Sequence, residues 1–134
     1  MTILRQAALV LALSCSLAGA ALAQADNGFP FGVDMQLETQ PQPGSKRLPS
    51  LEIGDRGEAQ LDLWCKKGKG QFSVANDTII FMPGAMTDQS CTPAAAQADD
   101  ALVNALAQAT NWKRQGDMVT FTGPATLRFR INTN

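Results

Sequence analysis

The chain has 134 residues, a formal net charge of -1 and 17% charged residues, which indicates one globular domain and excludes a multidomain enzyme. Its 11 basic and 12 acidic residues nearly balance, so the chain lacks the basic character typical of nucleic-acid-binding proteins. It contains no His and no Tyr, which excludes His-based triads, His metal ligands and imidazole proton transfer. We therefore expect no cofactor, no metal site and no catalytic residues.

Residues 1–23 have the three parts of a secretory signal peptide. Arg5 supplies the basic end, an apolar run covers residues 7–13, and small residues lead to an A-x-A cleavage site between Ala23 and Gln24. The apolar run is shorter than the roughly 20 residues that a membrane span needs. The mature chain is therefore expected to be periplasmic or secreted and to contain no transmembrane span.

Cysteine usage supports the same compartment. Signal cleavage would remove Cys15 and leave Cys65 and Cys91, an even number in an oxidising compartment, so we expect one disulfide. A bridge over a loop of this length contributes about 3 to 4 kcal/mol to stability in the chain-entropy model. Two alternatives stay open: lipid attachment at Cys15, where the preceding residues fit a lipoprotein signal less well, and a reactive thiol at Cys91, just before a helix start.

The first half of the mature chain predicts short strands joined by Pro- and Gly-rich connections. Residues 24–32 are expected to be flexible, followed by a short strand over 33–38. The segment 40–49 (QPQPGSKRLP) is predicted to be an exposed connection, because Pro withholds a backbone donor. After a short apolar segment at 50–53 and a turn, apolar residues alternate over 58–65, which predicts a half-buried strand with Cys65 inside and Trp64 outside.

Five cations form the candidate binding surface. The KKGKG segment contributes Lys66, Lys67 and Lys69, and its spacing differs from that of a phosphate-binding P-loop, so we expect a solvated loop without a ligand. Arg128 and Arg130 share one face of a predicted strand and could form a basic docking stripe. For all five, the alternative is an ordinary solvated side chain.

The second half predicts a hairpin, a helix and a closing pair of strands. Residues 71–74 and 78–82 alternate around an Asn-Asp turn, and Pro83-Gly84 is expected to end the second strand. Met82 and Met86 are assigned to packing rather than to metal binding. Apolar residues then alternate over 118–122 and 125–132, which predicts two antiparallel strands.

One amphipathic helix is expected over about 93–110. Thr92 suits the N-cap, Pro93 suits the first helical position, and apolar residues follow at three- and four-residue steps. Asp99 and Asp100 are adjacent, so their side chains point about 100° apart and cannot converge on one proton or metal ion. Both aspartates are therefore predicted to be solvated.

This order of segments resembles the META/HslJ-like domain of exported bacterial proteins. The resemblance rests on a strand ending in Trp64-Cys65, a Gly- and Lys-rich segment, a hairpin, a Met86-Thr87-x-x-x-Cys91 step, an Ala-rich helix and a closing LRFRI strand. It implies an α+β domain over 33–134: a small, mainly antiparallel β-sheet or open barrel with one helix. It further implies associations with heat shock or envelope stress and no established catalytic residues, and it fits pairing of Cys65 with Cys91.

Three functional hypotheses follow. The first is a monomeric accessory or binding module that contacts a protein partner in the cell envelope. The second is an inhibitor of an exported protease or lysozyme, inserting the KKGKG or QPQPGSK segment into its target. The third is an enzyme, which would have to use Asp62, Asp77 or Asp117, and no spacing predicts that these carboxylates converge. We expect a non-enzymatic protein.

Overall fold

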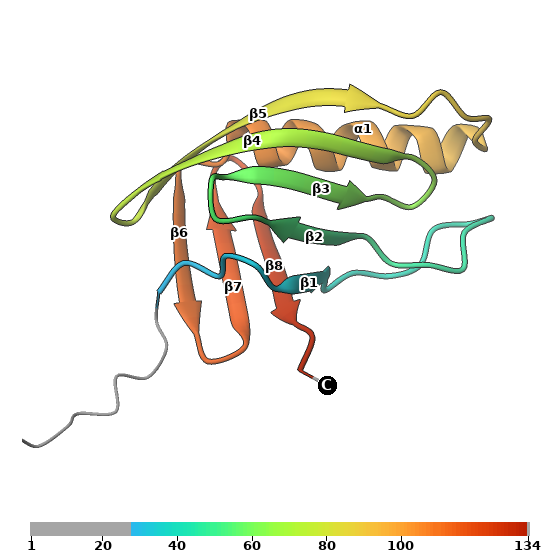
Figure 1. Ribbon diagram of the computed structural model, residues 1–134. Helices are drawn as coiled ribbons and strands as arrows, with labels where there is room; N and C mark the ends of the chain where they lie inside the picture. Colours follow the sequence, from blue (N-terminus) through green and yellow to red (C-terminus); the bar gives the residue numbers. More distant parts are fainter. Residues whose placement is uncertain (1–27, 134) are drawn as a thin grey trace, which may run out of the picture.

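Eight antiparallel strands follow one another around a ring in chain order, and pairing of the first strand with the last closes a barrel (Figure 1). The computed structural model describes residues 28–133. The strands are β1 (Asp34–Leu37), β2 (Ser50–Ile53), β3 (Glu58–Asp62), β4 (Lys67–Ala75), β5 (Thr78–Met86), β6 (Asn111–Gln115), β7 (Met118–Thr122) and β8 (Thr126–Ile131). The expected α+β class, mainly antiparallel with one helix in the described part of the chain, is confirmed.

The barrel interior is filled by the side chains that point inward from alternate positions of the strands. In β1, Met35 and Leu37 are buried while Asp34 and Gln36 are exposed, as period-two alternation requires. Aromatic rings occupy the centre, with Phe72 and Phe81 stacked at a centroid distance of 4.6 Å. This apolar interior is continuous across the sheet, so the barrel is a packed core rather than a channel.

Helix α1 (Pro93–Gln108) lies between β5 and β6 in the chain and packs mainly against β5, with further contacts to β8 (Figure 1). The N-cap of α1 is Thr92, whose hydroxyl oxygen accepts a hydrogen bond from the Ala95 backbone N–H at 3.3 Å. Leu102 and Leu106 enter the barrel core from one face of the helix. The pairing of β5 with β6 is confined to Thr78 opposite Asn111, and the helix covers the barrel next to this short pairing.

The KKGKG segment is not a solvated loop, because all but its first residue belong to β4. Lys67 and Lys69 point outward, and Gly68 and Gly70 point toward the interior. A Cβ added at Gly70 would lie 2.3 Å from the Phe81 ring, so the missing side chain makes room for that ring. The lysines suggested a loop, and the Gly-Lys alternation is in fact the period of a strand.

The predicted strand end at Pro83-Gly84 is also wrong, because β5 continues to Met86. Pro83 lies opposite Gly70 of β4, in a part of β5 that no other strand within residues 28–133 pairs with on the other side. Proline is tolerated there because its missing N–H costs no ladder bond at a free edge. Met82, assigned to packing, is 61% exposed, whereas Met86 is partly buried against the core.

Strand β3 ends at Asp62, earlier than the predicted end at Cys65. Leu63 and Trp64 are both buried, because the chain turns there and the Leu63 N–H donates to the Lys66 carbonyl at 2.8 Å. The turn interrupts the alternation, so Trp64 points inward rather than outward.

Two further segments differ from the predictions. Strand β6 was not expected, because its side chains do not alternate in hydrophobicity, and it forms a hairpin with β7 through Gly116, whose φ is +59°. In the segment 24–32, predicted to be flexible, the described residues 28–32 pack on one end of the barrel. Pro30 is buried, and the Phe29 ring meets Trp112 edge-on at 5.0 Å.

The two inward glycines of β4 should differ in tolerance to a methyl group. Gly70→Ala should lower the free energy of unfolding by about 1 to 3 kcal/mol, because the new Cβ meets the rigid Phe81 ring and the Met82 carbonyl. Gly68→Ala should cost less, because the nearest atom is the Met86 sulfur at the end of a flexible side chain. Urea denaturation of both variants measures the difference, and equal losses would contradict this packing.

Candidate functional site around the disulfide turn

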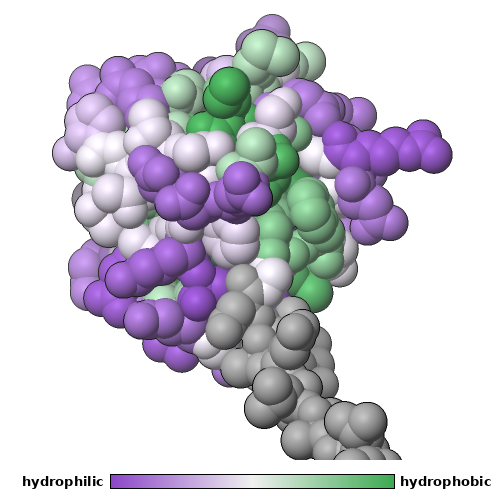
Figure 2. Space-filling model, turned by 90° about the vertical axis from the view of Figure 1, so that its left-hand side faces the viewer, coloured by the Kyte–Doolittle hydropathy of each residue, from purple (hydrophilic) through white to green (hydrophobic). Residues whose placement is uncertain are grey.

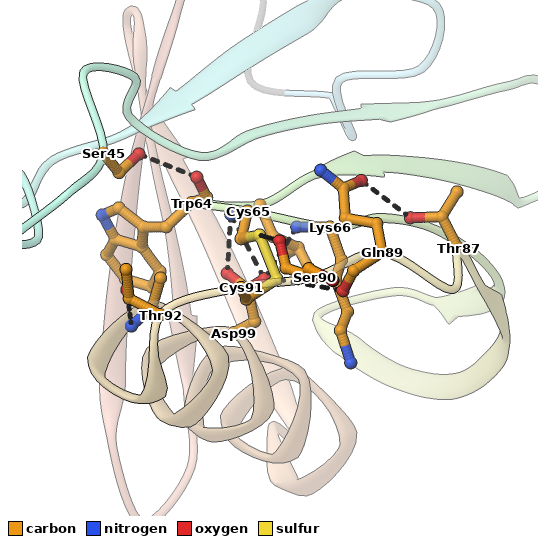
Figure 3. Close-up of a disulfide and its surroundings, with 12 residues drawn as sticks. Ser45, Trp64, Cys65, Lys66, Thr87, Gln89, Ser90, Cys91, Thr92 and Asp99 are labelled. Carbon is orange, nitrogen blue, oxygen red and sulfur yellow. Dashed lines mark hydrogen bonds between the residues drawn. A yellow bond between two sulfur atoms is a disulfide. The ribbon is translucent and has the colours of Figure 1, made fainter.

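A disulfide joins the turn after β3 to the segment before α1. Cys65 and Cys91 are bonded at 2.08 Å, with a Cα–Cα distance of 6.0 Å and a sequence separation of 26 residues (Figure 3). The expected pairing is therefore present in the structure. Because the bridge closes a long loop, it contributes about 3 to 4 kcal/mol in the chain-entropy model and holds the helix start against the turn.

Asp99 binds the same turn from the helix side (Figure 3). Its carboxylate is 0% exposed and accepts the Lys66 backbone N–H at 2.8 Å and the Cys65 backbone N–H at 3.2 and 3.3 Å. The prediction that Asp99 is solvated is wrong, whereas Asp100 is exposed as expected. The signal was available, because Asp99 lies four residues after Ala95 and three before Leu102, both on the buried stripe of the helix.

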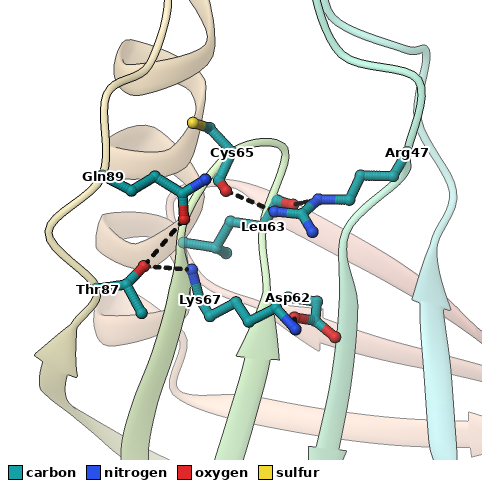
Figure 4. A network of polar contacts seen from close by, with 7 residues as sticks. All are labelled: Arg47, Asp62, Leu63, Cys65, Lys67, Thr87 and Gln89. Atoms are coloured by element: carbon teal, nitrogen blue, oxygen red, sulfur yellow. Dashed lines mark hydrogen bonds and ion pairs between the residues drawn. The ribbon is translucent and has the colours of Figure 1, made fainter.

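The carbonyl groups of the turn are bound from the opposite side by the 40–49 connection. The Ser45 hydroxyl donates to the Trp64 carbonyl at 2.7 Å, and the Arg47 guanidinium donates to the carbonyls of Leu63, at 3.0 Å, and Cys65 (Figures 3 and 4). The predicted exposed connection is thus fastened to the turn. Donors and acceptors of the turn are satisfied by two separate parts of the chain.

Trp64 forms part of a groove between α1 and the barrel wall. The groove has a volume of about 500 Å³ and is also lined by the helix residues Ala98, Ala101 and Ala105. Trp64 is 7% exposed, and its indole Nε1 is buried without a hydrogen-bond acceptor among residues 28–133. An unpaired buried donor costs about 1 to 3 kcal/mol, so this nitrogen is an uncommon feature of a folded domain.

The five predicted surface cations do not form one surface. Lys67 and Lys69 lie on the outside of β4, whereas Arg128 and Arg130 lie on the outside of β8. Three strands separate β4 from β8 in either direction around the ring, so the two pairs face opposite sides of the barrel. Lys66 lies in the disulfide turn and is only partly exposed.

Two of these cations are held by carboxylates at the surface. Lys67 Nζ lies 3.5 Å from an oxygen of Asp62 (Figure 4), and Arg130 Nη2 lies 2.6 Å from an oxygen of Glu38. These pairs are exposed, so each contributes between about 0 and 1 kcal/mol. For Lys69 and Arg128, no carboxylate of residues 28–133 lies within 4.0 Å of the charged nitrogens.

The carboxylates considered for catalysis are also dispersed. Asp62 ends β3 beside Lys67, Asp77 lies in the β4–β5 turn, and Asp117 lies in the β6–β7 turn. Asp62 and Asp77 flank opposite ends of β4, so these two carboxylates do not converge.

One group of potential metal ligands occurs in the described residues. Atoms of Cys65, Cys91 and Asp99 lie within 4.8 Å of one another. Because both sulfur atoms are in the disulfide, neither is available as a thiolate ligand.

The sequence interpretations of the N-terminus lie outside the described residues. They are the signal peptide over 1–23, cleavage between Ala23 and Gln24, and lipid attachment at Cys15. Within 28–133, no helix has the length and hydrophobicity of a membrane span.

A META domain family model matches residues 33–132, so the chain belongs to the META domain family. A protein structure solved by NMR has the same fold, with a TM-score of 0.59 and 17% identity over 74% of this chain and 88% of that chain. No curated protein matches. The family assignment agrees with the resemblance in the sequence, and at this identity the solved structure supports the fold alone.

The two neighbouring aspartates of α1 provide a matched test of the turn. Asp99→Ala should lower the free energy of unfolding by about 2 to 4 kcal/mol, because it leaves the buried N–H groups of Cys65 and Lys66 without acceptors. Asp100→Ala, at an exposed position, should change it by less than about 0.5 kcal/mol. Urea denaturation of the oxidised proteins measures both, and similar effects of the two substitutions would contradict the assigned role.

Proposed function

We propose that this META domain is an exported, non-enzymatic module that binds a protein partner in the cell envelope, in an accessory role under envelope stress. One observation carries the proposal: Ile80 and Met82 lie two residues apart on the outer face of β5 and are 65% and 61% exposed. Large apolar side chains that gather on a surface are typical of interaction sites. Figure 2 shows hydrophobic surface between hydrophilic patches at the barrel end that carries the β4–β5 turn.

The surroundings of these two residues favour a partner with apolar and acidic groups. On β4, Ser73 lies opposite Ile80 and Gln71 opposite Met82, and Lys69 is the next outward residue. Further along the same strands, a hollow of about 560 Å³ is lined by Lys67, Lys69 and Asp62, among other residues of β3 to β5. The β4–β5 face therefore combines an apolar anchor with a positive charge that could pair with a carboxylate of the partner.

The same strand disfavours a partner that adds a β-strand. Pro83 lies in the part of β5 that has no pairing on one side with any strand the structure describes, and proline on such an edge obstructs strand addition. The outer face of β5, rather than its edge, is therefore the proposed contact.

An inhibitor of an exported hydrolase is the second candidate, and one observation favours it. The 40–49 connection carries Pro41 and Pro43 and is fastened by Ser45 and Arg47 to the disulfide turn, which limits the entropy lost when such a segment enters a target. The KKGKG segment no longer supports this candidate, because it is a strand. An inhibitor would reduce the turnover of a purified envelope protease or lysozyme.

Export is tested by the intact mass of the protein recovered from the envelope of the cell that produces it. We expect a chain that begins at Gln24, lacks two hydrogens and gains two alkyl groups only after reduction, because Cys65 and Cys91 are bonded. A lipid adduct at Cys15, a chain that retains residues 1–23 or two free thiols would contradict the proposal of a soluble exported module.

The proposed surface is tested by binding. The double variant Ile80→Thr/Met82→Thr keeps residues that suit a strand and removes the apolar anchor, so it should weaken the affinity for an isolated envelope partner by about tenfold or more. Glu52→Thr, at an exposed position of β2, is the control and should leave the affinity unchanged. Equal binding by the unsubstituted protein, the double variant and the control variant would overturn the proposal. Multiple turnover of a substrate by the purified domain would do so as well.

A further inference from the structure

The groove between α1 and the barrel wall has a floor suited to an apolar ligand. Its volume is about 500 Å³. The helix contributes Ala98, Ala101 and Ala105 at three- and four-residue steps, so successive helical turns present a methyl group to the groove. On the other side it is lined by Leu37 of β1 and Leu127 of β8. Small side chains on the helix leave space that larger residues would fill.

One residue that lines this groove, Trp64, carries an unpaired hydrogen-bond donor beneath its surface. The two tryptophans of the chain differ: Trp112 Nε1 donates to the Asn76 carbonyl at 2.8 Å, whereas Trp64 Nε1 is buried and has no acceptor in the described part of the chain. Figure 3 shows the Trp64 nitrogen on the side of the ring away from the disulfide. Water does not reach this nitrogen in the free protein, so an acceptor would have to displace side-chain atoms that cover it.

The charge at the rim of the groove is positive on balance. Both Glu38 and Arg128 line the groove, and the Glu38 backbone N–H donates to the Arg128 carbonyl at 2.8 Å. The Glu38 carboxylate is neutralised by Arg130 at 2.6 Å, while the Arg128 guanidinium has no carboxylate of residues 28–133 within 4.0 Å. An anionic group that enters beside Arg128 would therefore meet an uncompensated cation.

We propose that this groove binds a ligand with an apolar body and a carboxylate, whose oxygens accept from Trp64 Nε1 and pair with Arg128. The apolar body lies on the alanine face of α1. A free organic acid and the C-terminus of a peptide both present this chemistry. The groove is separate from the β4–β5 face, so this inference does not depend on the proposed protein partner.

The two indole N–H signals in a ¹H–¹⁵N spectrum provide the test. Octanoate and the peptide acetyl-Ala-Leu-Leu with a free carboxylate are the probes, and octanamide and the peptide amide are their controls. We expect saturable downfield movement of the Trp64 signal as its N–H gains an acceptor, with the Trp112 signal unchanged because that N–H is already paired. Saturation by octanoate identifies a free acid as the source, and saturation by the peptide identifies a chain terminus.

Three substitutions separate this binding from a general effect. Trp64→Phe keeps an aromatic ring and removes the donor, and Arg128→Gln removes the charge beside the groove. Each should weaken binding of the probe by about fivefold or more. Because Trp64→Phe removes the indole signal, binding is measured here through the backbone amide signals of Ala101 and Ala105. Arg56→Gln, at an exposed position in the turn between β2 and β3 and outside the groove, should change affinity by less than about twofold. No Trp64 movement at about 10 mM probe, equal movement of both indoles, or equal binding of acid and amide would overturn the proposal.

Discussion

The buried carboxylate of Asp99 is the interaction on which the arrangement around the disulfide depends. It binds the backbone N–H groups of Cys65 and Lys66, while Ser45 and Arg47 bind the carbonyl groups of the same turn. A turn held on both sides keeps its position and carries Trp64 into the space beside the helix. The disulfide adds a covalent link at the same place, so the helix, the 40–49 connection and the barrel share one junction.

This junction also explains why the interior can contain an unpaired indole. A single strained or unsatisfied group persists when its surroundings over-determine its position. Here the disulfide and the hydrogen bonds to the backbone groups of the turn hold the backbone of Trp64 in place, and its side chain is buried in the core. The stability supplied by the junction therefore offsets the cost of one unpaired donor.

Period-two alternation and helix capping were sufficient to predict most of the fold, including β7, β8 and a helix that begins after Thr92. They failed where position in the sheet overrides residue type. Lys-Gly repeats and Pro83 suggest a loop, yet the glycines of β4 make room for Phe81 and the proline lies on a free edge. The candidate site was largely missed. The helix period indicates that Asp99 is buried, but its contact with the turn and the inward position of Trp64 arise only when the helix meets the turn.

The order of the strands sets when the core can be completed. Every strand pairs with its neighbour in the chain, except that β8 must find β1 to close the ring. A chain that becomes available from its N-terminal end can therefore form pairs of neighbouring strands early. The interior stays open to water until β8 pairs with β1. For a protein exported as we propose, the barrel could then close only after β8, near the C-terminal end of the domain, has crossed the membrane.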